Sequence, residues 1–203
     1  MMSPETTNMV QQSAFYAVIF CWWLFALTFW LRKRPPKVRE AKRDWTSLIG
    51  LLLQAVAYSL VWFNTLRWKQ LPAPARFESP AATSILAMLA VVIAVISVWM
   101  VNSAARWLGK QWALAARLVE GHELIQDGPY RLVRNPIYTG MFGMLLATGL
   151  IAAQWIPFAI AIVVFLAGTY IRIRSEERLL RQAFGPEFDA YARKVPAFLP
   201  GIF

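Results

Sequence analysis

The sequence predicts an all-helical integral membrane protein with five transmembrane helices. Of its 203 residues, 58% are hydrophobic, and several apolar runs reach the length of about 17 to 25 residues that crosses a bilayer as a helix. Only helices and closed barrels satisfy their backbone polar groups in lipid, and these runs are too long and too uniformly apolar for barrel strands. Basic residues gather at the ends of the runs, as they do beside membrane spans.

The five predicted spans are, in chain order, residues 14–31, 46–66, 81–101, 137–153 and 155–171. The last two are short and joined almost directly through Gln154, which predicts a tight C-terminal helical hairpin. Beyond Arg172 the tail is predicted to continue as a polar helix, to break at Gly185 and to form a short helix over 187–194. Close helix approach is expected at five glycines: Gly109, Gly140, Gly143, Gly149 and Gly168.

The distribution of Lys and Arg predicts the orientation in the membrane. Segments 32–45 and 102–136 and the tail from Arg172 carry seven, five and six basic residues, whereas the segment between the second and third spans carries three. Cytoplasmic loops carry the excess of basic residues. We therefore expect the N-terminus outside and these three segments, with the C-terminus, in the cytosol.

Several function classes are disfavoured by the sequence. The net charge of +10 lies at span ends rather than in a basic patch with a nucleic-acid-binding motif. One cysteine and one histidine make a His/Cys metal site unexpected, so no metal is predicted. Neither a nucleophile elbow nor a dinucleotide-binding glycine motif is present.

Two polar regions are the candidates for chemistry. Residues 122–138 are turn-rich and contain the single histidine, His122. On the helix after the last span, Arg172 and Glu176 share one face, and Glu177 is placed to pair with Arg174 or Arg181. This pattern fits either a solvated helix with surface ion pairs or a site in which Arg172 binds an anionic group on a lipid-borne molecule. Arg172 could equally reach outward to the headgroups.

The order of the motifs resembles the isoprenylcysteine carboxyl methyltransferase family and, more broadly, the membrane methyltransferases that include phospholipid methyltransferases. The motifs are H-x-L-I-x-x-G-P-Y-x-x-x-R-N-P-x-Y-x-G, then R-x-R-x-E-E, F-G-x-E-F-x-x-Y and R-K-V-P-A-F-L-P. They fall within residues 104–203. The resemblance therefore implies a three-helix anchor over 1–101 and a methyltransferase-like region over 102–203.

The resemblance further implies a cytosolic S-adenosylmethionine pocket and a lipophilic, membrane-borne methyl acceptor such as an isoprenylcysteine carboxylate. It assigns the orientation of the acceptor to Arg172, which is the catalytic candidate. It assigns cofactor binding to His122, Glu123, Leu124, Ile125, Tyr130, Asn135, Pro136, Ile137, Tyr138 and Glu176. The implied partners are the bilayer and a lipophilic or prenylated substrate, without nucleic acid.

One position departs from the family pattern, which commonly has histidine where this chain has Asn135. Asparagine still offers a hydrogen-bond donor and an acceptor but cannot act as a general base. A carboxylate acceptor needs no base, whereas an amine or thiol must lose a proton, for which His122 and Glu177 are the candidates. Two other functions remain open from the sequence: a membrane reductase using NADPH and a non-catalytic lipid-binding protein.

Overall fold

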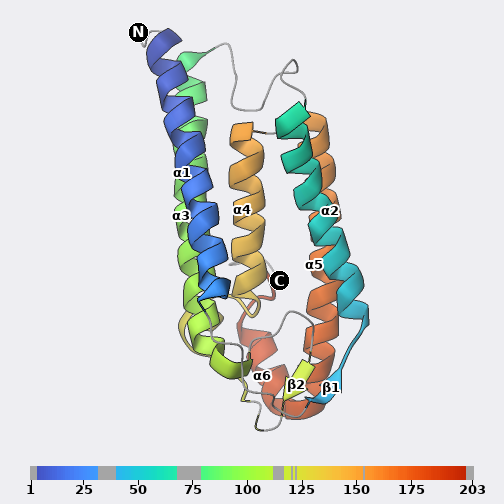
Figure 1. Cartoon of the computed structure of the whole chain (residues 1–203). Helices are drawn as coiled ribbons and strands as arrows, with labels where there is room; N and C mark the ends of the chain where they lie inside the picture. Colours follow the sequence, from blue (N-terminus) through green and yellow to red (C-terminus); the bar gives the residue numbers. More distant parts are fainter. Residues whose placement is uncertain are drawn as a thin grey trace.

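The computed structural model describes residues 4–31, 40–67, 79–111, 117–119, 121, 123–152 and 154–199. Within these residues, five helices of 17 or more residues lie roughly side by side in an elongated bundle (Figure 1). The predicted all-helical bundle is confirmed, with helix starts at or within one residue of the predicted second to fifth spans. The helices are α1 (Pro4–Trp30), α2 (Thr46–Arg67), α3 (Pro80–Leu108), α4 (Pro136–Ala152) and α5 (Trp155–Phe184).

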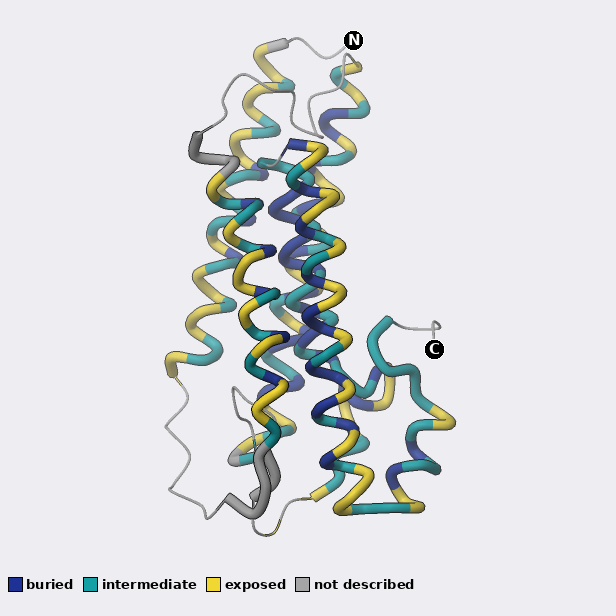
Figure 2. Tube along the Cα trace, turned by 90° about the vertical axis from the view of Figure 1, so that its right-hand side faces the viewer, coloured by how far each residue is buried: buried dark blue, intermediate teal, exposed yellow. Residues whose placement is uncertain are grey.

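The protein is a multi-pass membrane protein. In the described residues, α1, α2, α3 and α5 are long and apolar enough to cross a bilayer, while α4 is apolar but has only 17 residues. Large apolar side chains are exposed on these helices, including Trp23, Leu52 and Val163, each more than 60% exposed. Exposed positions recur along the length of the bundle (Figure 2). Such extensive apolar exposure is typical of a surface that faces lipid. The fifth span, α4, stays a prediction.

The short connection of the predicted hairpin is present, because α4 ends at Ala152 and Gln154 caps α5. However, the two helices pack chiefly on other partners: α4 lies against α3, and α5 lies against α2. Small residues allow the α3–α4 approach, since a Cβ on Gly140 would lie 2.8 Å from the carbonyl oxygen of Ser97. The boundary predicted at residue 101 falls inside α3, and the division into two regions stays a prediction.

Gly50 and Gly168 set the crossing of α2 and α5. A Cβ on Gly168 would lie 2.7 Å from the carbonyl oxygen of Gly50, and one on Gly50 would lie 2.4 Å from that of Gly168. The backbones therefore meet directly, and the polar side chains one turn away are brought into contact. Gly109 differs from the prediction: it ends α3 with a φ of 53°, and a Cβ there would meet no described residue within 4 Å. A positive φ, which glycine tolerates, explains that residue.

The polar segments gather at one end of the bundle. There β1 (Glu40–Arg43) pairs antiparallel with β2 (Arg117–Val119), close to η1 (Gly109–Gln111), η2 (Gly128–Arg131) and α6 (Pro186–Lys194) (Figure 1). This short ribbon is an addition to the predicted helices. The described parts of the three basic segments thus lie at the same end, as the predicted orientation requires. Which side of the membrane this end faces stays a prediction.

Asp44 joins α2 to α5 at this end. Its Oδ1 accepts hydrogen bonds from the backbone nitrogen of Thr46 at 2.9 Å and from the Thr46 hydroxyl at 2.6 Å. Arg178 of α5 lies 3.7 Å from the other carboxylate oxygen. The hydrogen bond from the Thr46 side chain is the largest cause that lowers the pKa of Asp44, which keeps this carboxylate ionised at the start of α2.

Candidate active site

Arg172, Tyr138 and Glu176 form a hydrogen-bonded chain between α4 and α5. Arg172 is 4% exposed, and its Nε donates to the Tyr138 hydroxyl at 2.9 Å. That hydroxyl donates in turn to Oε1 of Glu176, and the guanidinium carbon lies 4.9 Å from the centroid of the Tyr138 ring. Arg172 and Glu176, predicted to share one helix face, are therefore connected through a phenol of α4. The arginine lies inside the bundle rather than reaching outward.

Gln54 of α2 completes this chain from the other side. It is 1% exposed, its Oε1 accepts from NH1 of Arg172 at 3.3 Å, and its Nε2 donates to the Thr169 hydroxyl at 2.9 Å. The sequence analysis missed Gln54, although a signal was present: it is a single amide inside the apolar run LLLQAVAY. Polar side chains inside membrane spans are costly to bury and are often functional.

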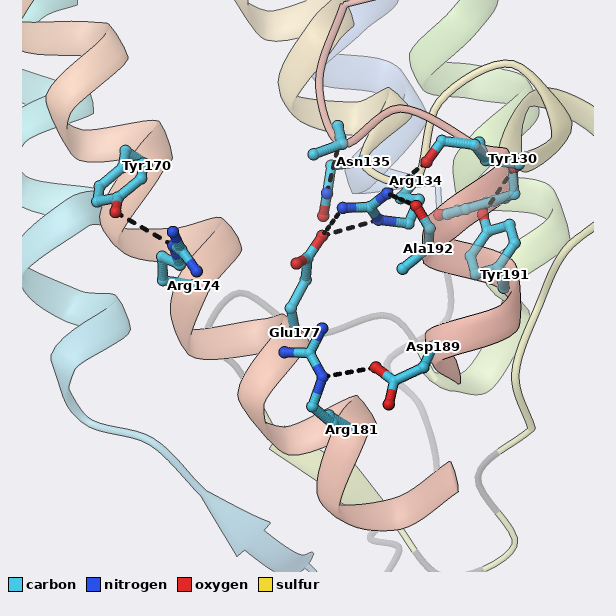
Figure 3. Close-up of polar contacts among 12 residues, drawn as sticks. Tyr130, Arg134, Asn135, Tyr170, Arg174, Glu177, Arg181, Asp189, Tyr191 and Ala192 are labelled. Atoms are coloured by element: carbon cyan, nitrogen blue, oxygen red, sulfur yellow. Dashed lines mark hydrogen bonds and ion pairs between the residues drawn. The ribbon is translucent and has the colours of Figure 1, made fainter. Parts of the chain in front are cut away.

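Arg134 and Glu177 form a second, separate pair beneath the first. Nε and NH2 of Arg134 both lie 2.8 Å from Oε1 of Glu177, with the two side chains 12% and 11% exposed (Figure 3). The predicted pairing of Glu177 with Arg174 or Arg181 is therefore wrong. Instead, Arg174 donates to the Tyr170 hydroxyl at 3.2 Å, and Arg181 pairs with Asp189 at 2.8 Å. Spacing along one helix could not reveal a partner that comes from the loop before α4.

Residues 195–199, here named the C-terminal strap, run along the start of α4. The backbone nitrogen of Arg134 donates to the carbonyl of Pro196 at 2.8 Å, and its NH1 donates to the carbonyls of Ala192, at 2.8 Å, and Val195. The Asn135 amide donates to the carbonyl of Ala197 at 2.8 Å (Figure 3). These bonds place the strap against the first turn of α4, which also contains Tyr138, the link between Arg172 and Glu176.

The side-chain amide of Asn135 therefore donates its hydrogen bond to the strap. Its amide nitrogen is bound to Ala197, and Thr139, one turn further along α4, donates through its hydroxyl to the carbonyl of Phe198. The side-chain oxygen of Asn135 keeps its acceptor capacity. At the position where the family commonly has histidine, this chain thus has a residue that fastens its own tail.

The other predicted cofactor residues lie along the approach to α4. Glu123 is exposed, and its backbone nitrogen donates to Oε1 of Gln111 at 2.8 Å. Tyr130 is buried, and its carbonyl accepts from the hydroxyl of Tyr191 at 2.7 Å. Burial is the largest cause that raises the pKa of Tyr191. Leu124 and Ile125 are half-buried in the segment before α4. Pro136 is buried at the start of α4, and Ile137 is half-buried in its first turn. His122 lies outside the described residues.

The structure thus brings together Arg172, Tyr138 and Glu176 of the predicted set, with Asn135 less than one helical turn from Tyr138. Glu123 lies apart from these residues in the fold, since its backbone nitrogen is bound to Gln111 at the end of α3. Within the described part of the chain, no group of three or more His, Cys, Asp or Glu side chains could hold a metal ion. Carboxylate, guanidinium, phenol and amide groups are left to bind a ligand, and these suit an organic molecule with charged ends.

The fold and site define a helical membrane protein with a buried ionic site at the polar end of its bundle. The model of the phospholipid methyltransferase family matches residues 85–187, just over half of the chain. The protein belongs to this family. The match confirms the resemblance drawn from the motifs, and it covers the α3–α5 segment that carries Arg172, Tyr138 and Glu176.

Individual relatives cover different parts of the chain. A nickel–cobalt–cadmium resistance protein of Alcaligenes xylosoxydans xylosoxydans is 34% identical over 110 residues, which cover 54% of this chain and 51% of the relative. Protein-S-isoprenylcysteine O-methyltransferase of Schizosaccharomyces pombe is 32% identical over 89 residues, 44% of this chain and 38% of the relative. Methanethiol S-methyltransferase 2 of Bradyrhizobium diazoefficiens is 27% identical over 190 residues, which cover 89% of this chain and 71% of the relative. The first two matches span only about half or less of those relatives.

Proposed function

We propose that this protein transfers a methyl group from S-adenosylmethionine to a lipophilic acceptor that it takes from the bilayer. The observation that carries the proposal is the Arg172–Tyr138–Glu176 chain, which places a cation and a carboxylate at the junction of polar and apolar parts of the bundle. Family membership and the relatives named as methyltransferases support the same reaction and favour it over a reductase or a non-catalytic lipid-binding protein.

The hydrogen-bond acceptors of the site fit the proposed cofactor. Glu176 accepts from Tyr138 through Oε1, and its carboxylate has a second oxygen, Oε2. That oxygen can accept a hydrogen bond from an amine or a ribose hydroxyl, and the amide oxygen of Asn135 offers a second acceptor. S-adenosylmethionine, when bound, supplies an electrophilic methyl group. The protein's own task is to align the acceptor and exclude water, which in-line displacement requires.

A carboxylate is the acceptor that this site serves best, as in an isoprenylcysteine-like molecule. It is ionised at neutral pH and needs no base, and the guanidinium of Arg172 can bind and orient it through a charge-assisted hydrogen bond. A thiol or amine acceptor would have to lose a proton. Of the two glutamates here, Glu177 is already held by Arg134 and Glu176 by Tyr138. The isoprenylcysteine relatives support the same choice.

The proposal is tested by two measurements on the purified, folded protein. Calorimetric titration should give saturable binding of S-adenosylmethionine and of its demethylated product. A labelled-methyl assay should then show transfer to a prenylcysteine analogue in preference to phosphatidylethanolamine and small thiols. Absence of cofactor binding would refute methyl transfer itself, whereas preferred transfer to a thiol would refute only the carboxylate acceptor.

A further inference from the structure

Gln54 makes a polar contact between α2 and the Arg172 side chain of α5. The backbones of α2 and α5 meet at Gly50 and Gly168, where neither helix has room for a side chain. One turn further along each helix, Gln54 and Arg172 therefore face each other directly. Gln54 is fully enclosed at this contact, at 1% exposure, and lies outside the region that the family model matches. Its contact therefore joins the N-terminal part of the chain to the matched region.

The amide of Gln54 is held in one orientation. A guanidinium offers only donors, so the oxygen of the amide must face NH1 of Arg172, 3.3 Å away. The amide nitrogen then points to Thr169, whose hydroxyl accepts at 2.9 Å. Since Nε of Arg172 is bound to Tyr138 on the other side, the guanidinium is fixed at two points by groups from two helices.

The chemistry of this contact matters because Gln54 is neutral. An amide oxygen fixes the position of Arg172 without adding a negative charge beside it, whereas a carboxylate in the same place would form a buried ion pair and compete with any anion that approaches. We propose that Gln54 is a positioning residue that holds Arg172 through an uncharged contact and thereby makes the site selective for an anionic acceptor. This inference rests on the proposed function for the identity of the acceptor.

The test compares binding of two probes that share the farnesyl tail and differ in the head group: S-farnesyl thioacetic acid, an anionic carboxylate, and its neutral primary carboxamide. Tryptophan fluorescence titration of the detergent-purified protein reports binding without turnover. Wild-type protein should bind the carboxylate about tenfold or more tightly than the carboxamide, the order expected for a charge-assisted hydrogen bond. In the Gln54→Glu variant this preference should fall below about twofold, through weaker binding of the carboxylate.

Two further variants make the outcome decisive. Gln12→Glu adds the same charge at an exposed position near the start of α1 and should keep the wild-type preference. Gln54→Met keeps the shape but removes the acceptor, and it should weaken carboxylate binding several-fold while affinity for S-adenosylmethionine stays within about twofold of wild type. If Gln54→Glu does not fold, Gln54→Met still tests the contact.

The inference is overturned if wild-type protein binds both probes equally, or if Gln54→Glu and Gln54→Met leave the carboxylate preference intact. It is also overturned if these variants weaken both probes and the cofactor in parallel, because that pattern belongs to a purely structural residue. Failure of the proposed function looks different, since it would appear as absent cofactor binding and absent methyl transfer in wild-type protein.

Discussion

Single side chains in this protein have roles that differ from those of their sequence neighbours. Glu176 and Glu177 are adjacent, yet the first is bound to Tyr138 and the second to Arg134. Successive residues on a helix point about 100° apart, so each glutamate faces a different partner. One belongs to the proposed ligand site, while the other holds the loop before α4.

Replacing Glu176 with glutamine tests its proposed contact with the cofactor. Glutamine keeps the length of the side chain but loses the charge, and hydrogen bonds to charged groups are worth about 1.5–3 kcal/mol. Calorimetry should therefore show affinity for S-adenosylmethionine reduced about tenfold or more. The exposed Glu187 provides the matched control, because Glu187→Gln should bind the cofactor as wild type does. Equal affinities for all three proteins would contradict the assignment.

Two arginines three residues apart allow a matched comparison of ion-pair energies. Arg134 and Glu177 are nearly buried, whereas Arg131 and Asp127 pair with side chains 74% and 57% exposed. Breaking a buried pair costs about 3–5 kcal/mol, and an exposed one about 0–1 kcal/mol. Thermal unfolding in detergent should show a much larger fall in Tm for Arg134→Met than for Arg131→Met. Similar small shifts would mean that the strap is not held by Arg134.

At the scale of elements, the site depends on two helices that approach through glycine. The crossing of α2 and α5 at Gly50 and Gly168 sets where Gln54 meets Arg172. The match to the family begins at residue 85 and does not include α2. The site is therefore shaped in part by a helix that sequence comparison with the family leaves out.

Gly168→Ala should separate α2 from α5. The new Cβ would lie 2.7 Å from the carbonyl oxygen of Gly50 and 2.9 Å from the Cβ of Leu53, and overpacking of this kind costs about 1–3 kcal/mol. We expect a lower Tm in detergent together with weaker binding of the farnesyl carboxylate, because Gln54 moves away from Arg172. Ala55→Leu, on the exposed face of α2, is the control and should change neither. An unchanged Tm for Gly168→Ala would contradict the close approach.

At the scale of the whole molecule, β1, β2 and α6 lie at one end of the bundle (Figure 1), with the described parts of the basic segments. The strap and the ionic site are bound to the start of α4. We propose that this end faces the cytosol, where S-adenosylmethionine is supplied, and that the apolar outer surface admits the acceptor from lipid. The charge distribution of eighteen basic residues against three supports this orientation.

Labelling of introduced cysteines tests the orientation. In a Cys21→Ser background, Glu5→Cys at the start of α1 and Glu123→Cys at the polar end are both at exposed positions. A membrane-impermeant maleimide should label the first on intact cells and the second only after permeabilisation. The reverse pattern would show that the topology is inverted. Labelling of both cysteines from outside would contradict the odd number of spans predicted between Glu5 and Glu123.

The sequence by itself determined the helical membrane architecture, the starts of four helices and the family. Each of these follows from local information: the length of apolar runs, the placement of Pro and Gly, and ordered motifs. The same local information indicated that Arg172 and Glu176 share a face, and the contacts through Tyr138 agree with it.

Only the tertiary structure decided which polar groups meet. It joined Arg134 to Glu177, Asn135 to the strap and Gln54 to Arg172, partners that are 43, 62 and 118 residues apart in the chain. It also showed that Gly109 ends a helix instead of joining two. The physical reason is the same in each case: periodicity indicates which face of a helix a side chain occupies, whereas its partner is set by how the helices cross.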